Sequence, residues 1–122
     1  MRVSPETTSR RAAFGIRVGG GTTNASISNN TVTSDTAIDV DATQVTISDN
    51  AVGGNGQSIA VGGGDSVVVT GNNASGNSRT GISLANVYGD SRVENNTIEA
   101  NGDHGLTIRA RQVEVRNNCH PI

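Results

Sequence analysis

Large aromatic side chains are almost missing from this chain, since Phe, Trp and Tyr make up 2% of its 122 residues and Trp does not occur. A core built around large rings is therefore excluded. The single cysteine, Cys119, excludes a framework of internal disulfides. The formal net charge is −2 and no cluster of basic residues occurs, which argues against nucleic acid as a partner.

Long apolar runs are also absent. No stretch approaches the roughly 18 apolar residues of a membrane-spanning helix, so no membrane partner is expected. The N-terminal segment MRVSPETTSRRAAF lacks the apolar run of a secretory signal. Three interpretations stay open: a cytoplasmic chain, a chain whose signal has been removed, or a piece of a longer protein. The last two predict an extracellular location.

The chain is instead rich in Gly, with 16 residues, and in Asn, Ser, Thr and Val, a mixture that favours strands with tight turns. It repeats itself five times, as GIRVGGGTTNASISNNTV, AIDVDATQVTISDNAV, SIAVGGGDSVVVTGNNA, GISLANVYGDSRVENNTI and GLTIRARQVEVRNNCH. One Asn recurs in every copy, at intervals of 20, 22, 24 and 22 residues. These residues are Asn30, Asn50, Asn72, Asn96 and Asn118. A period in this range indicates a solenoid.

Within each copy apolar residues alternate with polar ones, the pattern of a half-buried strand. The inward pairs of the first strand are Ile16/Val18, Ile38/Val40, Ile59/Val61, Ile82/Leu84 and Leu106/Ile108. Those of the second are Ala25/Ile27, Val45/Ile47, Val67/Val69, Ser91/Val93 and Val113/Val115. A third inward position holds Val32, Val52, Ala74, Ile98 and His120. The pattern predicts an all-β parallel solenoid of five coils over residues 15–122, with three short strands in each coil.

Residues 1–14 stand outside the repeat and are expected to form a cap or a partial coil. Ser4 is a suitable helix N-cap, and Pro5 and Glu6 suit the first helical turn, which predicts a short helix extending to Ala13.

The repeated Asn is predicted to occupy a sharp bend, because Asn adopts the left-handed backbone conformation more readily than most residues. Stacked Asn amides are also expected to hydrogen-bond from coil to coil. The five residues therefore form a predicted structural ladder.

The repeat resembles the right-handed parallel β-helix of the pectate-lyase-like superfamily. Its coil, G-[IL]-x-[VIL] … [VI]-x-[VI]-x-x-N-x-[VI], recurs with substitutions in all five copies over roughly residues 15–120. The resemblance implies right-handed coiling. It does not decide function, because that fold carries lyases, hydrolases, epimerases, phage tailspikes and non-catalytic modules.

One column of polar residues stands in the turn before the first strand of the coils. Counting back from the start of that strand places Asp35, Arg79, Asp103 and His104 in it. Carboxylate, guanidinium and imidazole groups together suit the binding of a uronate or acid–base catalysis. Arg79, Asp103 and His104 are thus the candidate catalytic residues, and all four are candidate ligand-binding residues. The structural alternative is an Arg79–Asp103 ion pair beside a solvent-facing His104.

The segment DHGLTI, from Asp103 to Ile108, resembles the Gly-His-Gly-[Ile/Leu]-Ser-[Ile/Leu] stretch of polygalacturonases. In that family the histidine supports neighbouring aspartates and a later Arg-x-Lys binds substrate. Here Asp103 replaces the first Gly, and Arg109-Ala110-Arg111 stands in for Arg-x-Lys. Glycoside hydrolysis requires two positioned carboxylates, which the sequence does not visibly supply. The acidic Ca²⁺ ligands and the arginine base of the related lyases are not visible either.

Other charged residues are predicted to form ladders between adjacent coils rather than a site. The predicted neighbours are Arg17 with Asp39, Arg92 with Glu114, and Glu94 with Arg116.

No cofactor is expected, and the only weak candidate for a metal site is a Ca²⁺ site. Asp39 and Asp41 offer a pair of carboxylates, but no third joins them, and a solvated acidic surface is the alternative. Cys119 and His120 are adjacent in a strand and point to opposite faces, so they predict no metal pair.

Two functions remain open. The first is a non-catalytic module with a structural or binding role, which associates with itself end to end through exposed coil edges as an oligomer or filament. The second is a carbohydrate-active protein or enzyme fragment, a lyase, hydrolase or epimerase, acting on acidic polysaccharide. An extended platform for stacking sugars is not expected, because only Phe14 and Tyr88 are aromatic.

Overall fold

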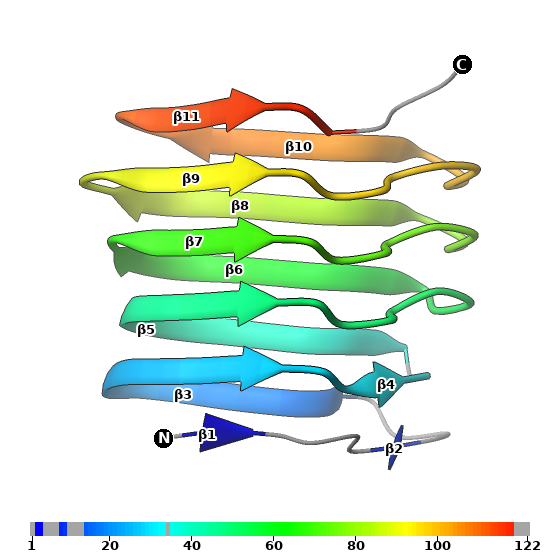
Figure 1. The fold of residues 1–122 in the computed structure, drawn as a ribbon, viewed down its shortest axis with the longest axis horizontal. Helices are drawn as coiled ribbons and strands as arrows, with labels where there is room; N and C mark the ends of the chain where they lie inside the picture. The colour runs from blue at the N-terminus through cyan, green and yellow to red at the C-terminus, as the bar shows by residue number, and fades with distance from the viewer. Residues whose placement is uncertain (1, 4–7, 10–13, 34, 119–122) are drawn as a thin grey trace.

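The computed structural model describes residues 2–3, 8–9, 14–33 and 35–118. The chain forms flat coils stacked on one another (Figure 1). It runs one way along the front strands and the opposite way along the rear strands while it rises, which makes the coil right-handed. The predicted all-β parallel solenoid of about five turns is confirmed. Among the described residues, no helix is long and apolar enough to cross a membrane.

Each coil contributes strands to two opposing faces. In the first two coils one continuous strand bends from the rear face to the front, as β3 (Phe14–Ser28) and β5 (Thr36–Ser48). In the later coils the bend divides the strand. The divided pairs are β6 (Gln57–Asp65) with β7 (Val67–Thr70), β8 (Thr80–Tyr88) with β9 (Ser91–Glu94), and β10 (His104–Ala110) with β11 (Val113–Arg116).

The third face contains very little strand. Single parallel bridges join Thr31, Ala51, Asn73 and Thr97 in successive coils. The first of these positions belongs to β4 (Thr31–Val32). The three-sided coil predicted from the sequence is therefore present, but its third side is only a residue or two wide.

Two short N-terminal strands lie along the first coil. β1 (Arg2–Val3) pairs in parallel with β3, and β2 (Thr8–Ser9) pairs in parallel with β4. Of the helix predicted to extend to Ala13, only Thr8 and Ser9 are described, and that part of the prediction is wrong because these two residues form a strand. The rest of the predicted helix lies outside the described residues.

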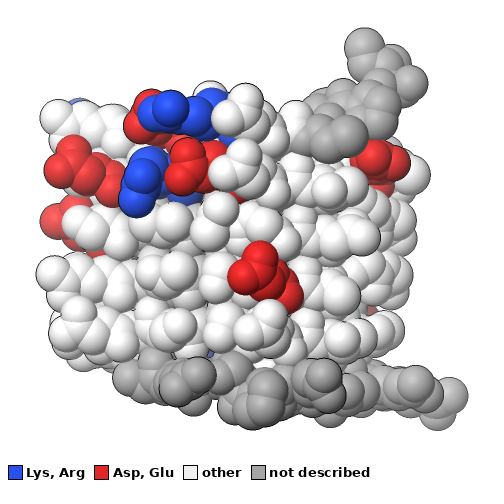
Figure 2. Space-filling view, in the orientation of Figure 1, with Lys and Arg blue, Asp and Glu red and all other residues white. Residues whose placement is uncertain are grey.

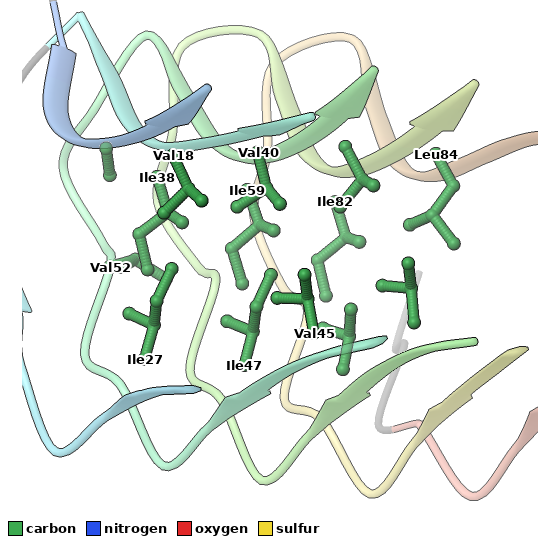
Figure 3. Close-up of a cluster of buried hydrophobic side chains, with 14 of the residues drawn as sticks. Val18, Ile27, Ile38, Val40, Val45, Ile47, Val52, Ile59, Ile82 and Leu84 are labelled. Atoms are coloured by element: carbon green, nitrogen blue, oxygen red, sulfur yellow. The ribbon is translucent and has the colours of Figure 1, made fainter. Parts of the chain in front are cut away.

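The predicted inward residues form one core between the two main faces. Figure 3 shows Ile38, Ile59 and Ile82 side by side, pointing toward Ile27 and Ile47 of the opposite face. In the second, third and fourth coils every predicted inward residue of these faces is at most 1% exposed. Because equivalent β-branched residues stack at each level, the core is filled without aromatic rings. His120, predicted for the third inward position of the last coil, lies outside the described residues.

The five repeated Asn residues form the predicted ladder. Each of the first four donates its backbone N–H and its side-chain N–H to the Oδ1 of the next Asn, at 2.9–3.1 Å. The second amide hydrogen of Asn72 is directed to the Ile47 carbonyl, at 2.9 Å. Asn50, Asn96 and Asn118 make the equivalent bond to the coil below. A buried amide group is thereby satisfied at every level.

The left-handed conformation at this bend belongs to the residue before the ladder Asn. The prediction that placed the ladder Asn itself in that conformation is wrong. The residues with positive φ, between 54° and 68°, are Asn29, Asp49, Gly71, Asn95 and Asn117. The preceding residue turns the backbone, and this turn directs the ladder side chain into the coil. The ladder position requires Asn because the side-chain amide supplies both a hydrogen-bond donor and an acceptor to the neighbouring coils.

We predict that Asn72→Ala lowers the free energy of unfolding by about 3 kcal/mol, because it leaves the partners of a buried amide unsatisfied in the coils above and below. Asn73→Ala is the matched control. Asn73 is the next residue and its side chain is exposed, so a change below about 0.5 kcal/mol is expected. Denaturant unfolding of both variants measures the difference. Equal losses would mean that the ladder does not stabilise the fold.

Candidate functional site

The predicted column lies in the loops that precede the rear strands, at the right of Figure 1. Backbone hydrogen bonds link the residues of this column across four consecutive coils. The Gln57 amide donates to the Asp35 carbonyl at 2.8 Å, Arg79 to Gly56 at 2.8 Å, and Asp103 to Arg79 at 2.9 Å. The structure thus stacks Asp35, Gly56, Arg79 and Asp103 in consecutive coils. The predicted order of the column is correct.

Gly56 leaves a gap in this column between Asp35 and Arg79. The Nη2 atom of Arg79 lies 3.5 Å from the position that a Cβ on Gly56 would occupy. The guanidinium therefore extends over Gly56, toward the coil that carries Asp35. A side chain at position 56 would approach the Asp35 carbonyl to 2.7 Å, so close stacking of the coils favours Gly there.

A depression of about 470 Å³ lies beside this gap. Its lining residues are Thr33, Asp35, Gly54, Asn55, Gly56, Gly76, Asn77 and Ser78. A Cβ built on Gly54 or Gly76 would meet no atom within 4 Å, which shows that these two positions open onto free space. The depression is shallow and largely open to solvent. Ser78 and Asp35 line the depression, and the Arg79 guanidinium lies next to Gly56 without lining it. Together these groups suit a polar ligand that carries hydroxyl or carboxylate groups.

Asp103 and His104 lie one coil above Arg79 and are both exposed. His104 pairs in register with Thr80, as predicted. None of the ion pairs in the described part of the chain joins Arg79 to Asp103. The structural alternative of such a pair is therefore not supported, whereas the solvent-facing position of His104 is confirmed. Asp103 and His104 are not among the residues that line the depression.

A second Asn ladder supports the floor of the depression, and the sequence-based prediction missed it. Asn55 donates its backbone N–H to Asn77 Oδ1 at 3.0 Å, and Asn77 donates its side-chain N–H to Asn101 Oδ1 at 2.7 Å. The preceding residues Gly54, Gly76 and Ala100 again have positive φ. The sequence contains a pattern that could have revealed this ladder, because each of these Asn residues follows a residue of the first Asn ladder by five positions.

The charge cluster, consisting of Arg92, Glu94, Glu114 and Arg116, lies over β9 and β11. Figure 2 shows it as the place on this face where basic and acidic side chains gather together, whereas most other charged groups in view are acidic and stand apart from it. Arg116 Nε lies 3.7 Å from Glu94 Oε2, which confirms that predicted pair. Arg92 lies in register with Glu114, but its Nη1 contacts Glu94 of its own strand at 3.7 Å, and Glu114 contacts Arg116. The predicted stacking of Arg92 under Glu114 is confirmed, while the ion pair of Arg92 is with Glu94, which lies two residues away and shares its face of the strand.

The remaining predicted charge pair is confirmed. Arg17 Nε lies 3.3 Å from Asp39 Oδ2, so one carboxylate of the weak Ca²⁺ candidate is already paired. In the described residues, no group of three or more His, Cys, Asp or Glu side chains is arranged to hold a metal ion. Cys119 and His120 lie outside the described residues.

We predict that Asp35→Ala, Arg79→Ala and His104→Ala each change the free energy of unfolding by less than about 0.5 kcal/mol, because these side chains are exposed. Denaturant unfolding measures the change. A loss above about 1.5 kcal/mol in any of them would assign that side chain a structural role.

Comparison with known proteins identifies the repeat. A family model described as "Right handed beta helix region" matches residues 7–120, which is nearly the whole chain. No curated protein and no solved structure matches the chain.

Proposed function

The chain belongs to the right-handed β-helix family, and we propose that it is a non-catalytic module with a structural role that associates with another copy through the edge of its last coil. The edge meant here is the side of β10 and β11 that faces away from β8 and β9. Among the described strands, β10 pairs with β8 alone and β11 with β9 alone.

The observation that carries the proposal is the burial of the core at this edge. Val115 is 45% exposed, whereas Val93, its equivalent one coil below, is fully buried. Leu106 and Ile108 are likewise only partly buried, although their equivalents Ile82 and Leu84 are fully buried. Among the described residues, apolar side chains of the kind that stack inside the solenoid are therefore partly exposed along this edge.

The backbone of β11 is also suited to a further strand. The Arg116 carbonyl accepts a hydrogen bond from the Asn95 amide of the coil below, at 3.2 Å. Successive residues of a strand direct their backbone groups to opposite edges, so the N–H and C=O groups of Val115 are directed to the open edge.

We predict that Val115→Pro weakens self-association by at least about tenfold, because proline removes the outward N–H. The coils below keep their hydrogen bonds, since those involve the residues on either side of Val115. Light scattering coupled to gel filtration over a concentration series measures the association constant.

Val115→Ile is the control, because it keeps a β-branched apolar side chain and the N–H group. It should associate like the parent chain. A parent chain that stays monomeric at every concentration would overturn the proposal, and so would an unchanged size of Val115→Pro.

A second candidate is action on an acidic polysaccharide. The depression of about 470 Å³ favours it, because Asp35 and Gly56 line this space and the Arg79 guanidinium lies next to Gly56. A guanidinium is suited to pairing with the carboxylate of a uronate. The exposed Asp103 and His104 lie one coil further and would supply acid–base groups to a chain that extends along the column.

Incubation with pectate or alginate, with and without Ca²⁺, tests this candidate by the formation of unsaturated products or reducing ends. Turnover that His104→Ala abolishes, while its folded signal stays unchanged, would support catalysis at the column. Absence of turnover on both polymers, together with no binding of either polymer that Arg79→Ala weakens, would eliminate the candidate.

A further inference from the structure

We infer that the open edge joins two copies of this chain through their β11 strands, which pair antiparallel about a two-fold axis at Val115. This inference rests on the proposed self-association and assigns its partner, strand and register. The occupant of the edge is the same β11 edge of a second copy, related by a half turn.

The alternation of β11 makes the strand suited to pairing with itself. Val113 packs against the core, and Val115 is in register with the buried Val93, whereas Glu114 and Arg116 face outward. In an antiparallel pair centred on Val115, each residue lies opposite the one equally far beyond the centre. Val115 then lies opposite Val115 of the second copy on the core side. Glu114 lies opposite Arg116 of the second copy on the outer side, and symmetry forms this contact twice.

The backbone groups of β11 also favour an antiparallel pair centred on Val115. Because the N–H and C=O groups of Val115 are directed to the open edge, two copies of Val115 can exchange both of their hydrogen bonds. The exposed apolar surface of Val115 is covered in the same step. The residue with the most exposed apolar side chain of the last coil is therefore also the residue whose backbone groups are available.

Charge excludes the neighbouring registers. A pair centred on Glu114 places two carboxylates opposite each other, and one centred on Arg116 places two guanidinium groups opposite each other. If the two-fold axis lay between two residues of β11, Val115 would lie opposite a charged residue, although Val115 lies on the core side of the strand and the charged residues face outward. Opposite charges on facing strands stabilise the pair and like charges destabilise it. Only the centre at Val115 matches both of the charges and the apolar side chains.

The charged side chains Glu114 and Arg116 contact each other within β11 and are still about half exposed, so each can also meet a second copy. Glu114 is 51% exposed and Arg116 is 52% exposed at the side chain. Arg116 also contacts Glu94 of the coil below, and this contact holds the guanidinium on the outer face of β11. A self-complementary patch of this kind closes into a dimer, whereas pairing of β11 with a different strand of the next copy would generate an open filament.

The test uses Glu114→Arg and Arg116→Glu in the full chain. Alone, each variant places like charges opposite each other twice, so its self-association should fall by about tenfold or more. Mixed in equal amounts, the two variants place Arg opposite Glu at both contacts. We expect the mixture to form a heterodimer with the affinity of the parent dimer. Light scattering measures the mass, and native mass spectrometry identifies the heterodimer.

Thermal unfolding of each variant separates loss of pairing from loss of fold, and rescue by mixing cannot arise from unfolded variants. Association of the parent chain without rescue in the mixture would overturn this inference and leave the proposed edge association in place. Growth of the parent chain beyond a dimer, into filaments, would do the same. A parent chain that is monomeric at every concentration would overturn both.

Discussion

The structure depends on one constraint: the backbone groups of each coil must be paired by the next coil. A coil of three short segments has no internal partner for most of its N–H and C=O groups, so each coil is stable only when stacked. At the bend, where strand pairing ends, the Asn ladder continues the pairing. The Asn50 side chain accepts the backbone N–H of Asn30 and holds a carbonyl of the coil below. The strand ladders and the Asn ladder are thus two parts of one hydrogen-bonded stack.

Stacking of this kind turns sequence positions into columns on the outer surface. A residue in one coil lies directly over its equivalent in the next, so a glycine in a column leaves a gap one coil high. The depression beside Asp35 arises in this way, because Gly54, Gly56 and Gly76 contribute no side chains to its walls. Coil stacking therefore determines where a ligand could bind, independently of any catalytic motif.

Because the coils are stacked, the two proposed activities, self-association and ligand binding, lie at separate places on the molecule. The open edge lies along β10 and β11, whereas the depression lies beside the loops before β6 and β8. Pairing of two β11 strands extends the stack in the direction in which it already grows. A ligand in the depression would contact only the side of the stack. Substitutions at one location therefore leave the other intact, and each function can be assessed separately.

The amino-acid sequence alone determined the repeat, the inward residues and the first Asn ladder, because each is a periodic pattern that depends on local alternation and on stacking of equivalents. The backbone order of the column from Asp35 to Asp103 followed for the same reason. The sequence-based prediction failed where several local solutions exist. Ser4, Pro5 and Glu6 suited the start of a helix, yet the adjacent first coil pairs Thr8 and Ser9 with β4 as a strand. The stacking of Arg92 under Glu114 was predicted correctly, but only the side-chain geometry showed that the ion pair of Arg92 is with Glu94. Which residue of each bend is left-handed, and that three glycines leave an open depression, depended on the distances between stacked coils, which are a property of the tertiary structure.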